Sequence, residues 1–165
     1  MPHWPSQTVS ALTKFYGNPV EKHGQSNKTW EKNNLVLVPV PYRMVLAWDD
    51  SKPVKSILIH KKCATSLSII LKAILGEYGS QGAIEDAGMD LFGGSYSYRP
   101  IAGSHRLSCH AWGCAIDLDP EHNAIGSRKW SMPADVVSIF EAQGWTWGGR
   151  WKHRPDPMHF QAAYL

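Results

Sequence analysis

Two imidazoles and a carboxylate in the C-terminal half of the chain are side chains of the types that hold a zinc ion. His110 and Asp117 belong to the segment Ser-Cys-His-Ala-Trp-Gly-Cys-Ala-Ile-Asp at residues 108–117, and His159 follows in Asp-Pro-Met-His-Phe. Three protein ligands that leave one position open for water are typical of a catalytic zinc site, whereas a structural site uses four. The sequence therefore predicts one catalytic Zn²⁺ bound by His110, Asp117 and His159.

Two further charged residues could act on a substrate at this ion. Asp156 lies three residues before His159 and is the predicted general base, which takes a proton from water and delivers it to the leaving amine. Arg99 is predicted to hold a substrate carboxylate or to stabilise an oxyanion. Together these residues indicate a zinc hydrolase that cleaves amide bonds.

Aromatic and small polar side chains surround the same motifs. We expect Ser108, Trp112, Trp147 and Trp151 to contact a peptide or glycan substrate. Burial in the core is the alternative for the tryptophans, because large aromatic side chains are highly buried on average.

The elements that must position the metal ligands are a strand pair and the turn before it. Gly113 lies between His110 and Asp117 and permits a turn or a bulge, so that a strand begins after it. On this strand Asp117 and Asp119 would share one face. His159, on a separate strand, would complete the set from across the sheet.

Helical and strand patterns are mixed along the rest of the chain, with residues 21–34 polar and loop-like and a loop at 100–107. Apolar spacing predicts helices, and β-branched runs predict strands. The predicted helices cover residues 9–15, 64–78 and 131–144, and the predicted strands cover 35–40, 44–48, 56–60 and 158–162. Without βαβ alternation, this pattern indicates an α+β fold with an antiparallel sheet, in a single domain spanning residues 1–165.

The composition excludes several classes of function. No apolar run approaches the roughly 20 residues of a membrane span, so we expect no membrane insertion. A net charge of +3 without long basic runs argues against nucleic acid and would favour an anionic polymer such as a cell wall. The three cysteines contain no Cys-x-x-Cys pair, which favours buried free thiols, although Cys109 and Cys114 could bind a soft metal.

The first residues, Met-Pro-His-Trp-Pro-Ser, lack the basic and apolar segments of a secretory signal. We therefore expect synthesis in the cytoplasm without a signal peptide, so that any action outside the cell would require release by another factor. We also expect a monomer.

The two motifs resemble those of the zinc D-alanyl-D-alanine carboxypeptidase family. The pattern Ser-x-His-x-x-Gly-x-Ala-x-Asp at residues 108–117, followed by Asp-Pro-Met-His-Phe at residues 156–160, carries the resemblance. It looks most like the branch of phage L-alanyl-D-glutamate endopeptidases that act as endolysins. The resemblance implies an α+β fold shared with the hedgehog signalling domain, and bacterial peptidoglycan as the partner, without a separate cell-wall-binding domain.

Carried over by position, the resemblance implies that His110, Asp117 and His159 are the zinc ligands and that Asp156 is the catalytic acid/base. Arg99 matches the Arg that faces the substrate. Many family members have Glu at the base position, where this chain has the shorter Asp.

Three functions are consistent with these residues. The first is an endopeptidase that cleaves the L-Ala–D-Glu bond of the peptidoglycan stem peptide as a phage endolysin. The second is a D-Ala-D-Ala carboxypeptidase or dipeptidase with the same chemistry. The third is a zinc-stabilised binding domain without turnover, since a fold alone does not fix function.

Overall fold

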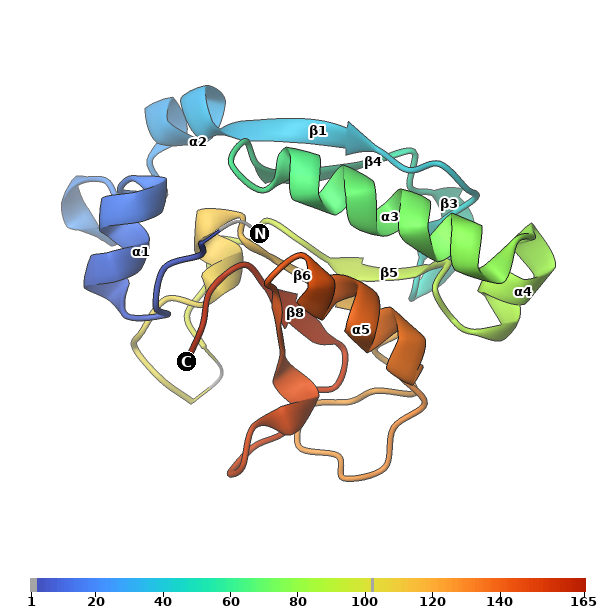
Figure 1. Ribbon diagram of the computed structural model, residues 1–165. Helices are drawn as coiled ribbons and strands as arrows, with labels where there is room; N and C mark the ends of the chain where they lie inside the picture. Colours follow the sequence, from blue (N-terminus) through green and yellow to red (C-terminus); the bar gives the residue numbers. More distant parts are fainter. Residues whose placement is uncertain (1–2, 102) are drawn as a thin grey trace.

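A mostly antiparallel sheet runs through the centre of the computed structural model, which describes residues 3–101 and 103–165 (Figure 1). Within these residues the strand order is β3-β2-β5-β6-β8-β7, and only the β2–β5 pair is parallel. The strands are β2 (Val45–Leu46), β3 (Asp49–Pro53), β5 (Leu91–Gly94), β6 (Ala115–Leu118), β7 (Thr146–Trp147) and β8 (His159–Gln161). Two further strands, β1 (Leu35–Pro39) and β4 (Ser56–His60), form an antiparallel ribbon. The structure confirms the predicted α+β class.

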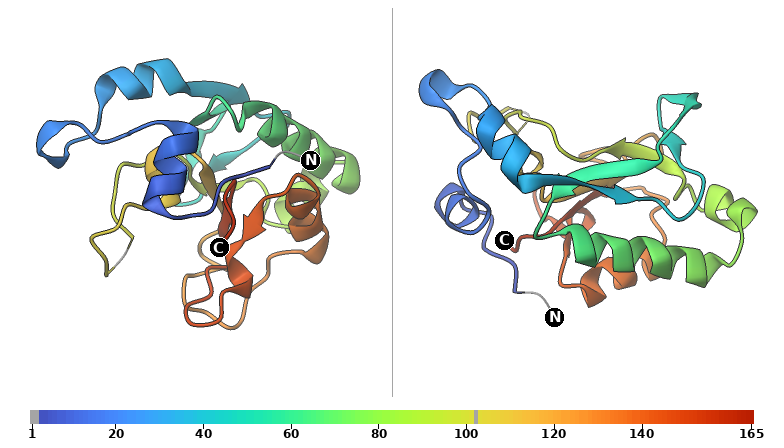
Figure 2. Two further views of the ribbon diagram at one scale, coloured as in Figure 1. Left: turned by 60° about the vertical axis from the view of Figure 1, so that its left-hand side comes forward. Right: turned by 90° about the horizontal axis from the view of Figure 1, so that it is seen from above.

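Two helices, α3 (Ala64–Tyr78) and α5 (Ala134–Ala142), pack against each other on one side of the sheet (Figures 1 and 2). The remaining helices are α1 (Val9–Tyr16), α2 (Lys28–Asn34) and α4 (Gln81–Asp86), and single 3₁₀ turns occupy η1 (Lys22–Gly24), η2 (Cys109–Trp112) and η3 (Gly148–Arg150). The apolar faces of α3 and α5 form one core with β6 and β8. This core includes Leu67, Ile70, Ile116, Phe140 and Phe160, all fully buried. Each of these side chains contributes about 1.5–3 kcal/mol by leaving water.

The predicted helix over residues 64–78 is confirmed with the same bounds. Its apolar residues recur at helical spacing, and Gly79 ends it in the left-handed conformation (φ 72°) with its N–H donating to the Leu75 carbonyl. The predicted helix at residues 131–144 is shorter, because Pro133 is extended and the helix begins at Ala134.

The prediction of a loop over residues 21–34 is wrong for its second half, which forms α2. The Asn27 side chain accepts a hydrogen bond from Trp30 N at 3.0 Å and caps the helix. Trp30 is buried, and its indole donates to the Tyr16 carbonyl at 2.9 Å. A single buried tryptophan therefore anchors a helix whose other residues are polar. In the predicted loop at 100–107, Ala102 lies outside the described residues.

Among the described residues, none of the helices is long and apolar enough to span a bilayer.

Candidate metal centre

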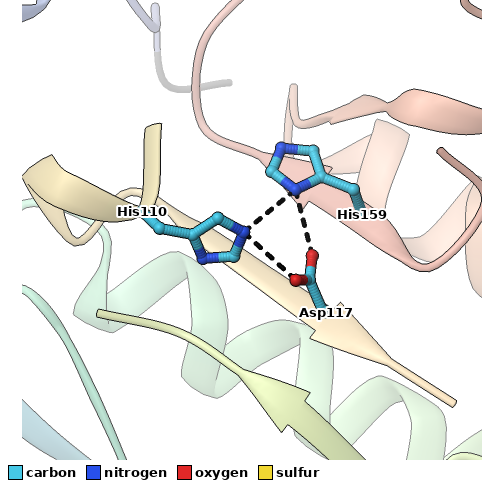
Figure 3. Close-up of side chains that lie close together, drawn as sticks. All are labelled: His110, Asp117 and His159. Carbon is cyan, nitrogen blue, oxygen red and sulfur yellow. Dashed lines mark hydrogen bonds and ion pairs between the residues drawn. The ribbon is translucent and has the colours of Figure 1, made fainter. Parts of the chain in front are cut away.

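Antiparallel pairing of β6 with β8 places Asp117 directly opposite His159. Successive residues of a strand point to opposite faces, so Ile116 and Leu118 enter the core while Asp117 points to the other side. Figure 3 shows the Asp117 and His159 side chains meeting on the side of β6 that faces away from α3. The predicted approach of these two residues from neighbouring strands is what the structure shows.

A tight turn at Gly113 brings His110 to the same place. Gly113 has a φ of 61°, and its N–H donates to the His110 carbonyl at 3.0 Å, which ends the 3₁₀ turn η2. A Cβ at this position would lie 2.7 Å from the Leu35 side chain and 3.0 Å from His60 N. Both the left-handed backbone and the close approach of the β1–β4 ribbon require glycine here.

The three side chains converge closely enough to share one cation. His110 Nε2 lies 3.2 Å from Asp117 Oδ2 and 3.2 Å from His159 Nδ1, and His159 Nδ1 lies 3.0 Å from Asp117 Oδ1 (Figure 3). Ligands about 2.0–2.1 Å from a tetrahedral zinc are separated by roughly 3.3 Å, close to these distances. All three residues are buried.

Each imidazole has its second nitrogen occupied by an acceptor. His110 Nδ1 donates to the Ser95 carbonyl at 2.6 Å, and His159 Nε2 donates to Gln161 Oε1 at 3.0 Å. Metal-binding histidines usually donate their other N–H in this way, which fixes the ring and the tautomer. When the imidazoles are neutral, the nitrogens left with lone pairs, His110 Nε2 and His159 Nδ1, are those that face Asp117.

The charges of the cluster stabilise one another. Burial acts to raise the pKa of Asp117, but the charge of His110 and hydrogen bonds from both imidazoles outweigh it and hold the pKa well below its usual range. Burial acts to lower the pKa of His159, but its hydrogen bond to Asp117 and the Asp117 and Asp156 charges raise it to about 9. A cation bound by the neutral imidazoles would supply the positive charge that their protons supply otherwise.

Asp156 lies beside the cluster on the loop that leads into β8. Its N–H donates to the Gly148 carbonyl at 2.9 Å, and its own carbonyl accepts from His159 N at 3.1 Å. Burial raises the pKa of its carboxyl, an effect that the charge of His159 opposes and that of Asp117 reinforces. Among the described residues, the buried Asp156 Oδ1 has no hydrogen-bond partner. An unpaired buried carboxylate oxygen is costly and suits an atom that meets water or substrate.

A cavity of about 300 Å³ opens over the cluster, and its wall includes His110, Asp117, Asp156 and His159. Its other polar lining comes from Gln7, Arg99, Arg106, Ser108 and Gln161, and its apolar lining from Ile101, Leu107, Ile125, Trp151 and Met158. The volume is in the range of small-molecule sites. The cavity thus combines two guanidinium groups, an apolar wall and the candidate metal ligands.

Two of the four predicted substrate residues line this cavity. Ser108 and Trp151 form part of its wall, and the Ser108 hydroxyl also accepts from His110 N at 3.3 Å. The prediction for Trp112 is wrong, because its side chain is fully buried in the core, with its indole donating to the Gly17 carbonyl at 3.1 Å. Trp147 is also buried, and its indole donates to the Pro157 carbonyl at 2.8 Å, so it supports the loop rather than a substrate.

The predicted common face of Asp117 and Asp119 is also wrong. β6 ends at Leu118, Asp119 has a φ of 46°, and Asp119 is not one of the described residues that line the cavity. The carboxylate instead bonds with His122 at 2.8 Å and with Asn123 at 3.2 Å. Asp119 organises the turn after the strand.

The sequence analysis missed several residues at the site. Ser95 acts through its backbone carbonyl, and Gln7 reaches the cavity from the opposite end of the chain. Gln161 lies two residues after His159, so the alternation of the strand could have indicated it. Arg106 could have been noticed as a second cation near the first motif.

The three cysteines are buried thiols. Cys109 borders the cavity, and Cys114 Sγ donates to the Cys109 carbonyl at 3.3 Å. In the described part of the chain, the group of possible metal ligands consists of His110, Asp117 and His159, without a thiol. The alternative of a soft metal bound by cysteine therefore has no support from the geometry.

Two imidazole nitrogens and a carboxylate oxygen within 4.8 Å of one another form a donor set that fits zinc. The unpaired Asp156 oxygen in the same cavity fits an open coordination position occupied by water or substrate. The site thus has the side chains that could hold a metal ion.

Residues 102–162 match a family model described as D-alanyl-D-alanine carboxypeptidase. This segment includes the three candidate ligands and Asp156 and is less than half of the chain. No curated protein and no solved structure matches the chain. The family match supports a peptidase, and the structure contains a cluster that could bind the metal of such a peptidase.

Proposed function

We propose that this protein is a zinc-dependent peptidase that hydrolyses the stem peptide of bacterial peptidoglycan and cleaves the L-Ala–D-Glu bond as a phage endolysin. The observation that carries the proposal is the convergence of His110, Asp117 and His159 in one cavity with an Asp156 oxygen that has no partner among the described residues. The family match over the same residues supports the peptidase class.

His110, Asp117 and His159 would hold the ion, with Ser95 and Gln161 fixing the imidazoles. A bound Zn²⁺ polarises a carbonyl oxygen and lowers the pKa of water to about 7. The Asp156 carboxylate takes the proton of the attacking water and then delivers it to the leaving amine. Its raised pKa suits this double role, because a group that accepts and returns a proton works best near the operating pH.

Arg99 and Arg106 bind the carboxylate of the substrate. Both line the cavity, and guanidinium groups pair with carboxylates through two parallel hydrogen bonds. By contrast, Ile101, Ile125 and Trp151 form an apolar part of the wall, which suits aliphatic side chains such as that of alanine. The cavity thus suits a short peptide that carries both methyl groups and negative charge.

A second candidate is a D-Ala-D-Ala carboxypeptidase or dipeptidase. Two arginines beside the reacting centre suit a terminal carboxylate, and the name of the matching family model is that of this activity. The third possibility, a binding domain without turnover, would need neither Asp156 nor a cavity beside the ligands, and both are present.

Digestion of purified muropeptides, followed by mass spectrometry, tests the proposal. Cleavage between L-Ala and D-Glu supports the endopeptidase, loss of a single D-Ala supports the carboxypeptidase, and intact muropeptides with zinc bound would leave only the binding domain. A chelator should abolish cleavage, and added zinc should restore it.

The variant Asp156→Asn tests the role of the base, because it removes the base and keeps the three metal ligands. We expect a 10²- to 10⁴-fold loss of turnover with the zinc content unchanged. Asp86→Asn, on an exposed position of α4, is the matched control and should keep full activity. Full activity of Asp156→Asn would refute the role of the base.

The proposal extends to the setting of the reaction. A monomer made in the host cytoplasm would reach peptidoglycan only after release, so purified protein should lyse cells with a permeabilised outer membrane and spare intact ones.

A further inference from the structure

The side chain of Gln161 lies between the candidate ligand His159 and the N-terminal segment, and only 1% of the residue is exposed. Its Oε1 is 3.0 Å from His159 Nε2, while its Nε2 is 3.1 Å from Gln7 Oε1 and 3.3 Å from the Ala163 carbonyl. His159 and Gln161 share one face of β8 because they are two residues apart. The amide oxygen thus contacts the imidazole, and the amide nitrogen holds the amide in place through two hydrogen bonds.

The Ala163 carbonyl determines which way the Gln161 amide points. A backbone carbonyl can only accept, so the amide NH₂ must face it and the amide oxygen must face His159. That oxygen can only accept, so the imidazole carries a proton on Nε2. The free lone pair is then on Nδ1, which lies 3.0 Å from Asp117 Oδ1 and 3.2 Å from His110 Nε2.

The backbone of Gln7 is fixed to the C-terminal segment that follows β8. Gln7 N donates to the Tyr164 carbonyl at 2.7 Å, and Tyr164 N donates to the Pro5 carbonyl at 3.0 Å. Ser6 and Tyr164 form a parallel bridge. The Gln7 side chain therefore meets Gln161 from an anchored position, although 154 positions separate the two residues.

We propose that Gln161 is a positioning residue that holds His159 in its Nδ1-binding tautomer, and that Gln7 completes this support from the N-terminal segment. The inference rests on the proposed zinc-dependent function; it specifies the tautomer that Gln161 imposes and adds Gln7 to the support. Loss of such a partner behind a metal-binding histidine costs about 10- to 100-fold in metal affinity.

Two variants of matched length test the role of Gln161. Gln161→Met removes the acceptor, whereas Gln161→Glu keeps an oxygen at the same reach, and the OH of its neutral carboxyl group can donate to the Ala163 carbonyl as the amide NH₂ does. Zinc dissociation constants, measured by competition with a chromophoric chelator, should rise 10- to 100-fold for Gln161→Met and stay near the wild-type value for Gln161→Glu. The exposed Gln25→Met is the control for the substitution itself and should bind zinc as the wild type does.

The visible absorption of bound cobalt(II) gives a second readout, which reports on the geometry of the ligands. Gln161→Glu should reproduce the wild-type bands, and Gln161→Met should shift them. Wild-type affinity in Gln161→Met, or an equal loss in Gln161→Glu, would overturn the role of Gln161.

Gln7→Met should weaken zinc binding less than Gln161→Met does, because the Ala163 carbonyl still orients the Gln161 amide. An unchanged dissociation constant would overturn the part assigned to Gln7. Absence of zinc binding in the wild type would overturn the proposed function itself, whereas normal wild-type binding with an unaffected Gln161→Met would overturn this inference alone.

Discussion

Gly148→Ala should displace Asp156, the proposed general base, more than it displaces the candidate metal ligand His159. An added Cβ would lie 2.5 Å from the Asp156 carbonyl oxygen, 3.1 Å from Asp156 Cβ and 3.3 Å from His159 Cβ. The carbonyl oxygen must retreat by roughly 1 Å to reach ordinary van der Waals contact, and it carries the Asp156 side chain with it. A misplacement of about 1 Å can cost about 100-fold in rate. We therefore expect a loss of about that size in turnover.

The assay is the initial rate of muropeptide hydrolysis, with the zinc dissociation constant measured in parallel. Gly148→Ala should lose turnover by a larger factor than it loses zinc affinity. Gly76→Ala is the matched control, because Gly76 is exposed on α3 with nothing within 4 Å of an added Cβ. It should gain up to about 1 kcal/mol in stability at full activity. A folded Gly148→Ala protein with wild-type turnover would refute the steric control of Asp156.

Three more predictions concern stability and metal binding. His60 donates to the Tyr16 carbonyl and accepts from Lys62 N, and burial lowers its pKa to about 4, below the unfolded value near 6.5. The protein should therefore lose roughly 2–3 kcal/mol of stability as the pH falls from 6.5 to 4. In urea unfolding, the stability of His60→Gln should fall less over this pH range than that of the wild type. Tyr16→Phe should cost about 1–3 kcal/mol in the same assay, because the hydroxyl donates to the buried Ala162 carbonyl at 2.6 Å; an unchanged midpoint would contradict this. The pKa of His159 is raised to about 9, so zinc must displace a proton to bind below that pH. Calorimetry should find that the zinc affinity rises about tenfold per pH unit between pH 6.5 and 8.5. A zinc affinity that does not change with pH would exclude the proton exchange.

The sequence was sufficient for the parts of the site that depend on local spacing. His110, Gly113 and Asp117 lie in one short motif, and a glycine between two ligands already indicates the turn that the structure contains. The helix at 64–78 was also predictable, because its apolar residues recur on one face. In both cases the information lies within a few residues of the feature.

Features that depend on distant contacts could not be predicted. The carbonyl of Ser95 and the side chain of Gln7 support the imidazoles only because the fold brings separate segments together. Trp112 and Trp151 flank similar motifs, yet only tertiary packing decides that the first is in the core and the second on the cavity. Asp119 was misplaced because strand alternation does not indicate where a strand ends.

The pairing of the two chain ends has a consequence during synthesis. Tyr16 bonds to Ala162 across 146 positions, and Gln7 meets β8 only after almost the whole polypeptide has been made. Such long-range closure is slow and late in folding. A ribosome-bound or prematurely terminated product would therefore lack part of the cavity wall, and the proposed hydrolytic activity would arise only when the last strand docks.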